Sequence, residues 1–173
     1  MKVLVVDDTA LTRAAVRDML EGLGHEYLAA PSAEEGLARY RQTRPDVVLS
    51  DWVLSGRDGI WLCRQIRCRP GRRYTYVIIQ TSLGREERPV EAMLAGADAF
   101  LEKPVRIDRL AAVLVAAERV TSLHARLAES EGRNRRLAEE QAALARVATS
   151  VAAGADVWSM CADAAREIGR AHV

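Results

Sequence analysis

The sequence has few cysteines and no long apolar run. Its cysteines, Cys63, Cys68 and Cys161, are odd in number and lack the spacing of a metal site. We therefore expect free thiols in a reducing compartment. No apolar stretch approaches the ~18 residues that a membrane-spanning helix needs, and the N-terminus lacks the pattern of a signal peptide. These absences predict a cytoplasmic protein without a membrane partner.

An excess of charge of either sign is also missing. The chain has 25 Lys and Arg against 24 Asp and Glu, a formal net charge of +1. This balance gives no electrostatic reason to expect nucleic acid or an anionic membrane surface as a partner. The length of 173 residues accommodates one domain of common size plus an extension.

Short apolar runs without alternation are what the sequence has instead, and they are typical of strands buried on both faces. We expect strands at 3–6, 27–30, 47–49, 76–79 and 99–101. Helical patterns separate these runs. We expect helices at about 11–22, 32–43, 58–69 and 85–95, and a fifth after Pro104. The second begins at a capping box formed by Ser32 and Glu35, and the third begins at Asp58. Strands that alternate with helices predict an α/β fold with a doubly wound, five-stranded parallel sheet.

Polar residues follow four of the expected strands: Asp7 and Asp8, then Asp51, Thr81 and Lys103. Parallel sheets bind ligands at the carboxyl ends of their strands, so we expect these side chains on one rim. The adjacent carboxylates of Asp7 and Asp8 repel each other unless water, a proton or a cation intervenes, and carboxylates suit Mg²⁺. A hydroxyl and an ammonium group can hold phosphoryl oxygens. The set therefore predicts a site that handles a phosphoryl group.

The order and spacing of these residues resemble the receiver domain of two-component response regulators. The resemblance covers about residues 1–120 and includes DGIWLCRQIR after the third strand and AGADAFLEKP around the lysine. It implies a flavodoxin-like sheet with strand order 2-1-3-4-5 and a receiver domain over 1–118. It also implies a phosphoacceptor domain that is not an ordinary enzyme, because it catalyses only its own phosphorylation and dephosphorylation. The implied phosphodonor is a histidine kinase or a phosphotransfer protein.

The resemblance assigns the acidic residues to phosphoryl acceptance and metal binding. Asp51 is the implied phosphoacceptor. The implied cofactor is Mg²⁺, which Mn²⁺ can replace. Its ligands would be Asp8 directly, Asp7 mainly through water, Asp51 itself, and the backbone carbonyl of Val53.

The remaining assignments concern switching. Thr81 is the implied switch hydroxyl and Lys103 the cation that binds the phosphoryl group. Phe100 matches an aromatic switch position, and a plain strand-end aromatic of the core is the equal alternative. Ser55 stands where many family members have proline, a departure that removes no expected ligand.

After Val113 the apolar spacing alternates between three and four, the 3.5-residue period of a coiled coil. We expect a long helix whose coiled-coil part covers 119–152 and pairs two chains in parallel, as a homodimer that relays the signal to an output. The predicted seam comprises Val120, Leu123, Leu127, Asn134, Leu137 and Leu144. The alternative is a single helix folded back on the receiver. Residues 153–173 are similar to the entry helix of a further, GAF-like domain.

Two other function classes compete with this interpretation. An aspartate phosphatase of the haloacid dehalogenase type needs two carboxylates separated by one residue, whereas Asp7 and Asp8 are adjacent. A flavodoxin-like FMN-binding module would place hydroxyls and amides after the first strand, where two carboxylates would repel phosphate.

Overall fold

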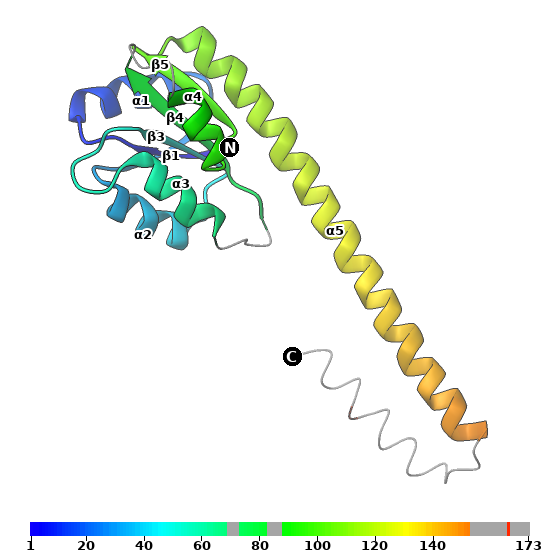
Figure 1. Cartoon of the computed structure of the whole chain (residues 1–173). Coiled ribbons are helices and arrows are strands. Elements are labelled where there is room, and N and C mark those ends of the chain that lie inside the picture. The colour runs from blue at the N-terminus through cyan, green and yellow to red at the C-terminus, as the bar shows by residue number, and fades with distance from the viewer. Residues whose placement is uncertain (69–72, 83–87, 153–165, 167–173) are drawn as a thin grey trace. The chain divides into compact units, whose positions relative to one another are not determined.

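The computed structural model of the chain describes residues 1–68, 73–82, 88–152 and 166. Strands and helices alternate along it (Figure 1), in the order β1 (Lys2–Val6), α1 (Ala10–Gly22), β2 (Glu26–Ala30), α2 (Ala33–Thr43), β3 (Val47–Asp51), α3 (Gly59–Arg67), β4 (Tyr76–Ser82), α4 (Arg88–Leu94), β5 (Ala99–Lys103) and α5 (Ile107–Ala152). The strands form a five-stranded parallel sheet in the order β2-β1-β3-β4-β5. The predicted fold class and strand order are confirmed.

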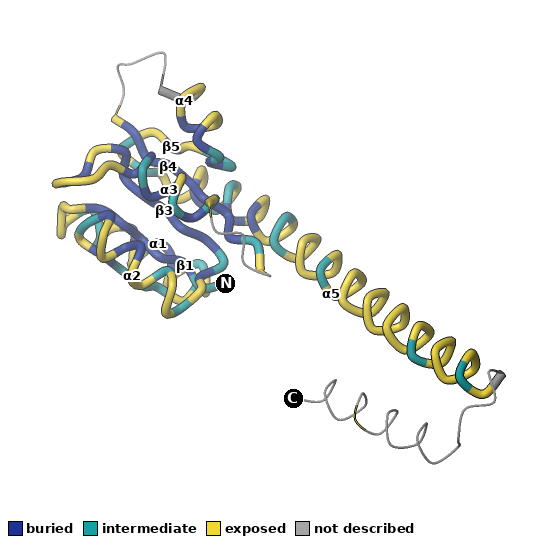
Figure 2. Tube along the Cα trace, turned by 60° about the horizontal axis from the view of Figure 1, so that its bottom comes forward, coloured by how far each residue is buried: buried dark blue, intermediate teal, exposed yellow. Residues whose placement is uncertain are grey.

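Helices cover both faces of the sheet, which explains why the strands lack alternation. On one face, α2, α3 and α4 bury side chains that include Leu37, Leu62 and Ala92. On the other face, α1 and the start of α5 bury side chains that include Leu20 and Leu114. β3 is buried at every position, and the central strands are dark in Figure 2. A strand covered on both sides gains from apolar residues at consecutive positions.

Both predicted helix caps are present. The Ser32 hydroxyl accepts a hydrogen bond from the backbone N–H of Glu35 at 3.2 Å, and the Asp58 carboxylate accepts one from the N–H of Trp61 at 2.7 Å. The fourth helix was expected at 85–95; α4 runs over Arg88–Leu94, and residues 83–87 lie outside the described residues.

Three strands run further than the apolar pattern predicts. β3, β4 and β5 continue through Asp51, Ser82 and Lys103, whereas the expected strands stop at 49, 79 and 101. Polar side chains at a strand terminus do not interrupt backbone pairing: Asp51 pairs with Gln80, and Ser82 with Lys103. The polar residues of the rim are therefore part of the sheet itself.

α5 is a single helix of 46 residues whose beginning belongs to the sheet domain. Leu110, Leu114 and Ala117 are buried in the core, and Val113 and Val120 pack half-buried against it. The chain divides into two compact units, Met1–Arg126 and Leu127–Val173. The further domain expected at 153–173 lies almost wholly outside the described residues.

Of the cysteines, Cys63 is buried and Cys68 exposed, both as free thiols, and Cys161 lies outside the described residues. Among the described helices, none is both long enough and apolar enough to span a bilayer.

Candidate functional site

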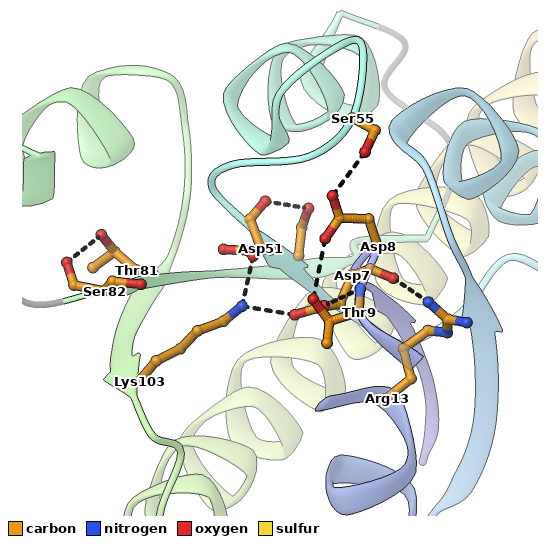
Figure 3. Close-up of polar contacts among 10 residues, drawn as sticks. Asp7, Asp8, Thr9, Arg13, Asp51, Ser55, Thr81, Ser82 and Lys103 are labelled. Carbon is orange, nitrogen blue, oxygen red and sulfur yellow. Dashed lines mark hydrogen bonds and ion pairs between the residues drawn. The ribbon is translucent and has the colours of Figure 1, made fainter. Parts of the chain in front are cut away.

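The carboxyl ends of β1, β3 and β5 bring the predicted acidic residues and the predicted lysine together (Figure 3). Asp7 and Asp8 follow β1, Asp51 is the last residue of β3, and Lys103 is the last residue of β5. One carboxylate oxygen each from Asp7, Asp8 and Asp51 lies within 4.8 Å of the others. Residues far apart in the chain thus form one acidic cluster.

Lys103 bridges two of these carboxylates. Its Nζ donates to Asp7 Oδ2 at 2.7 Å and to Asp51 Oδ2 at 2.5 Å. The Asp7 side chain is completely buried, and a buried carboxylate is tolerated when it is paired and hydrogen-bonded. Burial alone would lower the pKa of Lys103, but the hydrogen bonds to Asp51 and Asp7 outweigh it and raise that pKa above its ordinary 10.5. Lys103 therefore stays protonated and balances part of the negative charge.

Asp51 is held by the main chain around it. The backbone N–H of Trp52 donates to the Gln80 carbonyl at 2.8 Å, which continues the pairing of β3 with β4. Gly59 packs directly on the backbone of Asp51, since a Cβ at that position would lie 2.1 Å from the Asp51 carbonyl oxygen. Burial raises the pKa of the Asp51 carboxyl, although the hydrogen bond and charge of Lys103 oppose the rise. A carboxylate of raised pKa is a more basic oxygen nucleophile once ionised.

Asp8 has a partner that the sequence did not indicate. Ser55, in the loop between β3 and α3, donates its hydroxyl to Asp8 Oδ2 at 2.8 Å, and Thr9 Oγ1 lies 3.4 Å from Asp8 Oδ1. The hydrogen bond from the Ser55 side chain lowers the pKa of Asp8, against the smaller opposing effect of burial. Sequence reasoning treated Ser55 only as a departure from a proline. The available signal was a hydroxyl in the loop that follows the acceptor strand.

Arg13 is a second residue that the sequence analysis missed. It lies on α1, and its guanidinium donates to the backbone carbonyl of Asp7 at 2.7 Å. The backbone N–H of Thr9 donates to Asp7 Oδ1 at 2.8 Å. Together with Lys103, these contacts fix the completely buried Asp7 from both its main chain and its side chain.

The three other predicted site residues are Thr81, Val53 and Phe100. Thr81 is buried, and its hydroxyl donates to the Ser82 carbonyl at 3.3 Å. The Val53 side chain is exposed, while its backbone hydrogen bond acts, more weakly than burial, to lower the pKa of Asp51. Phe100 is 37% exposed, so it is not a fully buried core aromatic.

The donor set fits a hard divalent cation. Carboxylate oxygens are the ligands that Mg²⁺ prefers, and Mg²⁺ usually retains several waters beside one or two protein carboxylates. Asp8 is exposed and Asp51 buried, so a cation bound between them could keep water ligands on the side of Asp8. Lys103 balances one of the three negative charges of the cluster, so an excess of negative charge favours a cation there.

Comparisons with known proteins agree with this geometry. A family model described as the response regulator receiver domain matches residues 3–115. The two-component response regulator PhoP of Pseudomonas aeruginosa is 37% identical over 122 residues, which are 70% of this chain and 53% of PhoP. The chemotaxis protein CheY of Halobacterium salinarum is 34% identical, over 66% of this chain and 98% of CheY. The phosphate regulon regulator PhoB of Rhizobium meliloti is 33% identical over 49% of its own length, so this chain spans about half of the longer relatives.

Solved structures give the same result. The receiver domain protein of Clostridium thermocellum superposes with a TM-score of 0.66 at 31% identity, covering 70% of this chain and 97% of that one. The receiver domain of the Francisella response regulator 1452 gives a TM-score of 0.63 at 31% identity, over 69% and 98% of the two chains. The similarity thus extends over the whole of each solved domain.

Proposed function

Because this chain belongs to the response regulator receiver domain family, we propose that Asp51 accepts a phosphoryl group from a phosphohistidine of a histidine kinase or phosphotransfer protein. Proteins of this family act in two-component signalling, and receiver domains bind Mg²⁺ at an acidic pocket. The observation that carries the proposal is the bridge from Lys103 to Asp51 and Asp7 beside Asp8. This arrangement supports the proposal because the carboxylate proposed as nucleophile, a cation and the proposed metal ligands lie on one rim.

In the proposed reaction an Asp51 carboxylate oxygen attacks phosphorus. The P–N bond of the phosphohistidine breaks as the P–O bond forms, and the imidazole leaves with the electron pair. Lys103 is already within hydrogen-bond distance of Asp51 and moves to the phosphoryl oxygens, where its charge offsets theirs. Asp7, Asp8, Asp51 and the Val53 carbonyl would hold Mg²⁺, which when bound would add positive charge against the developing negative charge. The acyl phosphate is later hydrolysed at the same site.

Thr81 and Phe100 are the proposed readout of the phosphorylated state. The Thr81 hydroxyl, which here donates to the Ser82 carbonyl, would turn toward the phosphoryl oxygens. Phe100 is exposed enough to change its rotamer, and without a hydroxyl it would act through packing. The modification would therefore favour one of two arrangements of this edge of the sheet.

Incorporation of phosphate from acetyl phosphate tests the acceptor assignment. Intact-mass measurement should find one phosphoryl group on the parent chain with Mg²⁺ and none after EDTA. Asp51→Asn should remain unmodified, whereas Asp58→Asn, an equivalent change in the same loop, should be modified like the parent because an amide oxygen still caps α3. Equal labelling of Asp51→Asn and the parent would contradict the proposal. An FMN-binding module would show no such modification.

We also propose that residues 119–152 of α5 pair two chains as a parallel coiled coil. Its predicted seam residues Leu123, Leu127, Leu137 and Leu144 are each more than half exposed in the single chain, and a partner helix would cover them. Sedimentation velocity should find a dimer for the parent and a shift toward monomer for Leu137→Asn. Ala142→Asn, outside the seam, should remain dimeric. A monomeric parent would favour the alternative of a single helix.

A further inference from the structure

The loop between β3 and α3 contacts the end of β1 through the Ser55 hydroxyl. Ser55 Oγ donates to Asp8 Oδ2 at 2.8 Å, across 47 positions of the chain. Figure 3 shows Ser55 above Asp8, with the hydrogen bond between them. The contact joins the acceptor loop to a carboxylate of the acidic cluster.

The main chain of this loop determines where Ser55 lies. The loop begins at Trp52, whose N–H is bonded to the Gln80 carbonyl, and the buried side chain of Leu54 anchors it next to Ser55. Gly56 follows with φ of 92°, a conformation that favours glycine. Asp58 then caps α3. Ser55 is therefore placed by fixed neighbours on both sides.

The hydrogen bond is compatible with metal binding by Asp8. A carboxylate has two oxygens with about four lone-pair sites, so a donor on Oδ2 leaves Oδ1 for a cation. The Thr9 hydroxyl at 3.4 Å from Oδ1 is at the limit of a hydrogen bond. Carboxylates that ligate metals are themselves commonly hydrogen-bonded, and those outer contacts set their orientation. Asp8 is exposed, so without the Ser55 hydroxyl fewer contacts would hold its side chain in one orientation.

We propose that Ser55 is a positioning residue, which holds the Asp8 carboxylate in the orientation that binds the divalent cation. The inference rests on the proposed function, because it assumes that the acidic cluster binds Mg²⁺. Removal of the hydroxyl should weaken Mg²⁺ binding about three- to tenfold. This lies at or below the lower limit of the about 10- to 100-fold effect of outer-contact changes at metal sites, because both groups are solvent-accessible.

Isothermal titration with MgCl₂ alone, on the full chain, tests the proposal without any phosphodonor. Ser55→Ala should raise the Kd for Mg²⁺ about three- to tenfold, and Ser55→Thr, which keeps a hydroxyl, should restore most of the affinity. Thr9→Val removes the other, longer hydroxyl contact to Asp8 and should change the Kd by less than about twofold. Unfolding midpoints in EDTA should agree for all four chains, which shows that the variants fold.

The possible results separate the two proposals. Equal Kd values for Ser55→Ala and the parent would overturn the role of Ser55 and leave the proposed function intact. A Ser55→Thr variant as weak as Ser55→Ala would also overturn it, because the effect would not come from the hydroxyl. A parent chain that binds no Mg²⁺ at millimolar concentration would overturn the metal site itself, and the role of Ser55 with it.

Discussion

Replacing Lys103 with methionine should destabilise the fold in the absence of metal. The ammonium lies 2.7 Å from the completely buried Asp7 carboxylate and 2.5 Å from Asp51, so Lys103→Met leaves two neighbouring carboxylates without a counter-charge. Breaking a buried ion pair costs about 3–5 kcal/mol. The Lys103 side chain is 20% exposed, so solvent screens part of the loss and we expect about 2–3 kcal/mol. Urea unfolding at pH 7 in EDTA should find the midpoint lower by about 1 M.

Mg²⁺ should reverse much of this loss, because it places positive charge where the ammonium was. Binding at ten times Kd stabilises a fold by about 1.4 kcal/mol, and the variant site should have the lower Kd, since no ammonium competes there. Lys2→Met provides the matched control: the ion pair of Lys2 with Glu26 is 3.8 Å long and largely exposed, so its loss should cost less than about 0.5 kcal/mol. A Lys103→Met chain as stable as the parent in EDTA, or an equal gain from Mg²⁺ in both chains, would refute the reasoning.

Three further predictions follow from individual residues. Burial raises the folded pKa of Asp51 above 3.8. The stability contributed by its protonated form is therefore fully present below pH 3.8 and is lost as the pH rises through the folded pKa. Asp51→Asn should have a higher urea midpoint than the parent at pH 7 in EDTA, and the difference should vanish in acid. Gly59→Ala would place a Cβ 2.1 Å from the Asp51 carbonyl oxygen and should lower the free energy of unfolding in urea by about 2–3 kcal/mol. Gly132 has open space around it, so Gly132→Ala should instead increase the helical circular dichroism signal. Gln80 is completely buried, and neither polar atom of its side chain has a hydrogen-bond partner among the described residues, so Gln80→Met should raise the free energy of unfolding by about 1–3 kcal/mol; a destabilised Gln80→Met would mean that the amide has a partner after all.

The sheet and the position of its acidic rim could be predicted from sequence because both follow from local rules. Consecutive apolar residues indicate strands covered on two faces, and parallel strands place their carboxyl ends on one edge. Asp7, Asp8, Asp51 and Lys103 could therefore be grouped without coordinates. The apolar runs stop short of the strand ends, since hydropathy reports burial of side chains, whereas strand length depends on backbone pairing.

The contact of Ser55 with Asp8 could not be predicted, because it depends on the path of a loop. The buried Leu54 and the positive φ of Gly56 fix that path, and neither produces a periodic pattern. Arg44 is a similar case: it ends α2 with φ of 45°, a conformation in which glycine would be expected. The heptad spacing also did not predict which seam residues would pack against the sheet domain, as Val120 does.

Val120 contacts the core of its own domain and is also predicted to contact a different surface, the second helix of the proposed dimer. In the single chain it packs half-buried against the core of its own domain, while the heptad pattern places it in the seam of the proposed dimer. Any free energy that this side chain gains from the second helix must be reduced by what it loses at the first contact. If the proposed dimer covers the same surface of Val120, a change that loosens the core around this side chain would tighten chain association, and the reverse. In the proposed dimer, a valine at the junction would thus link the packing of the domain to the concentration at which two chains associate.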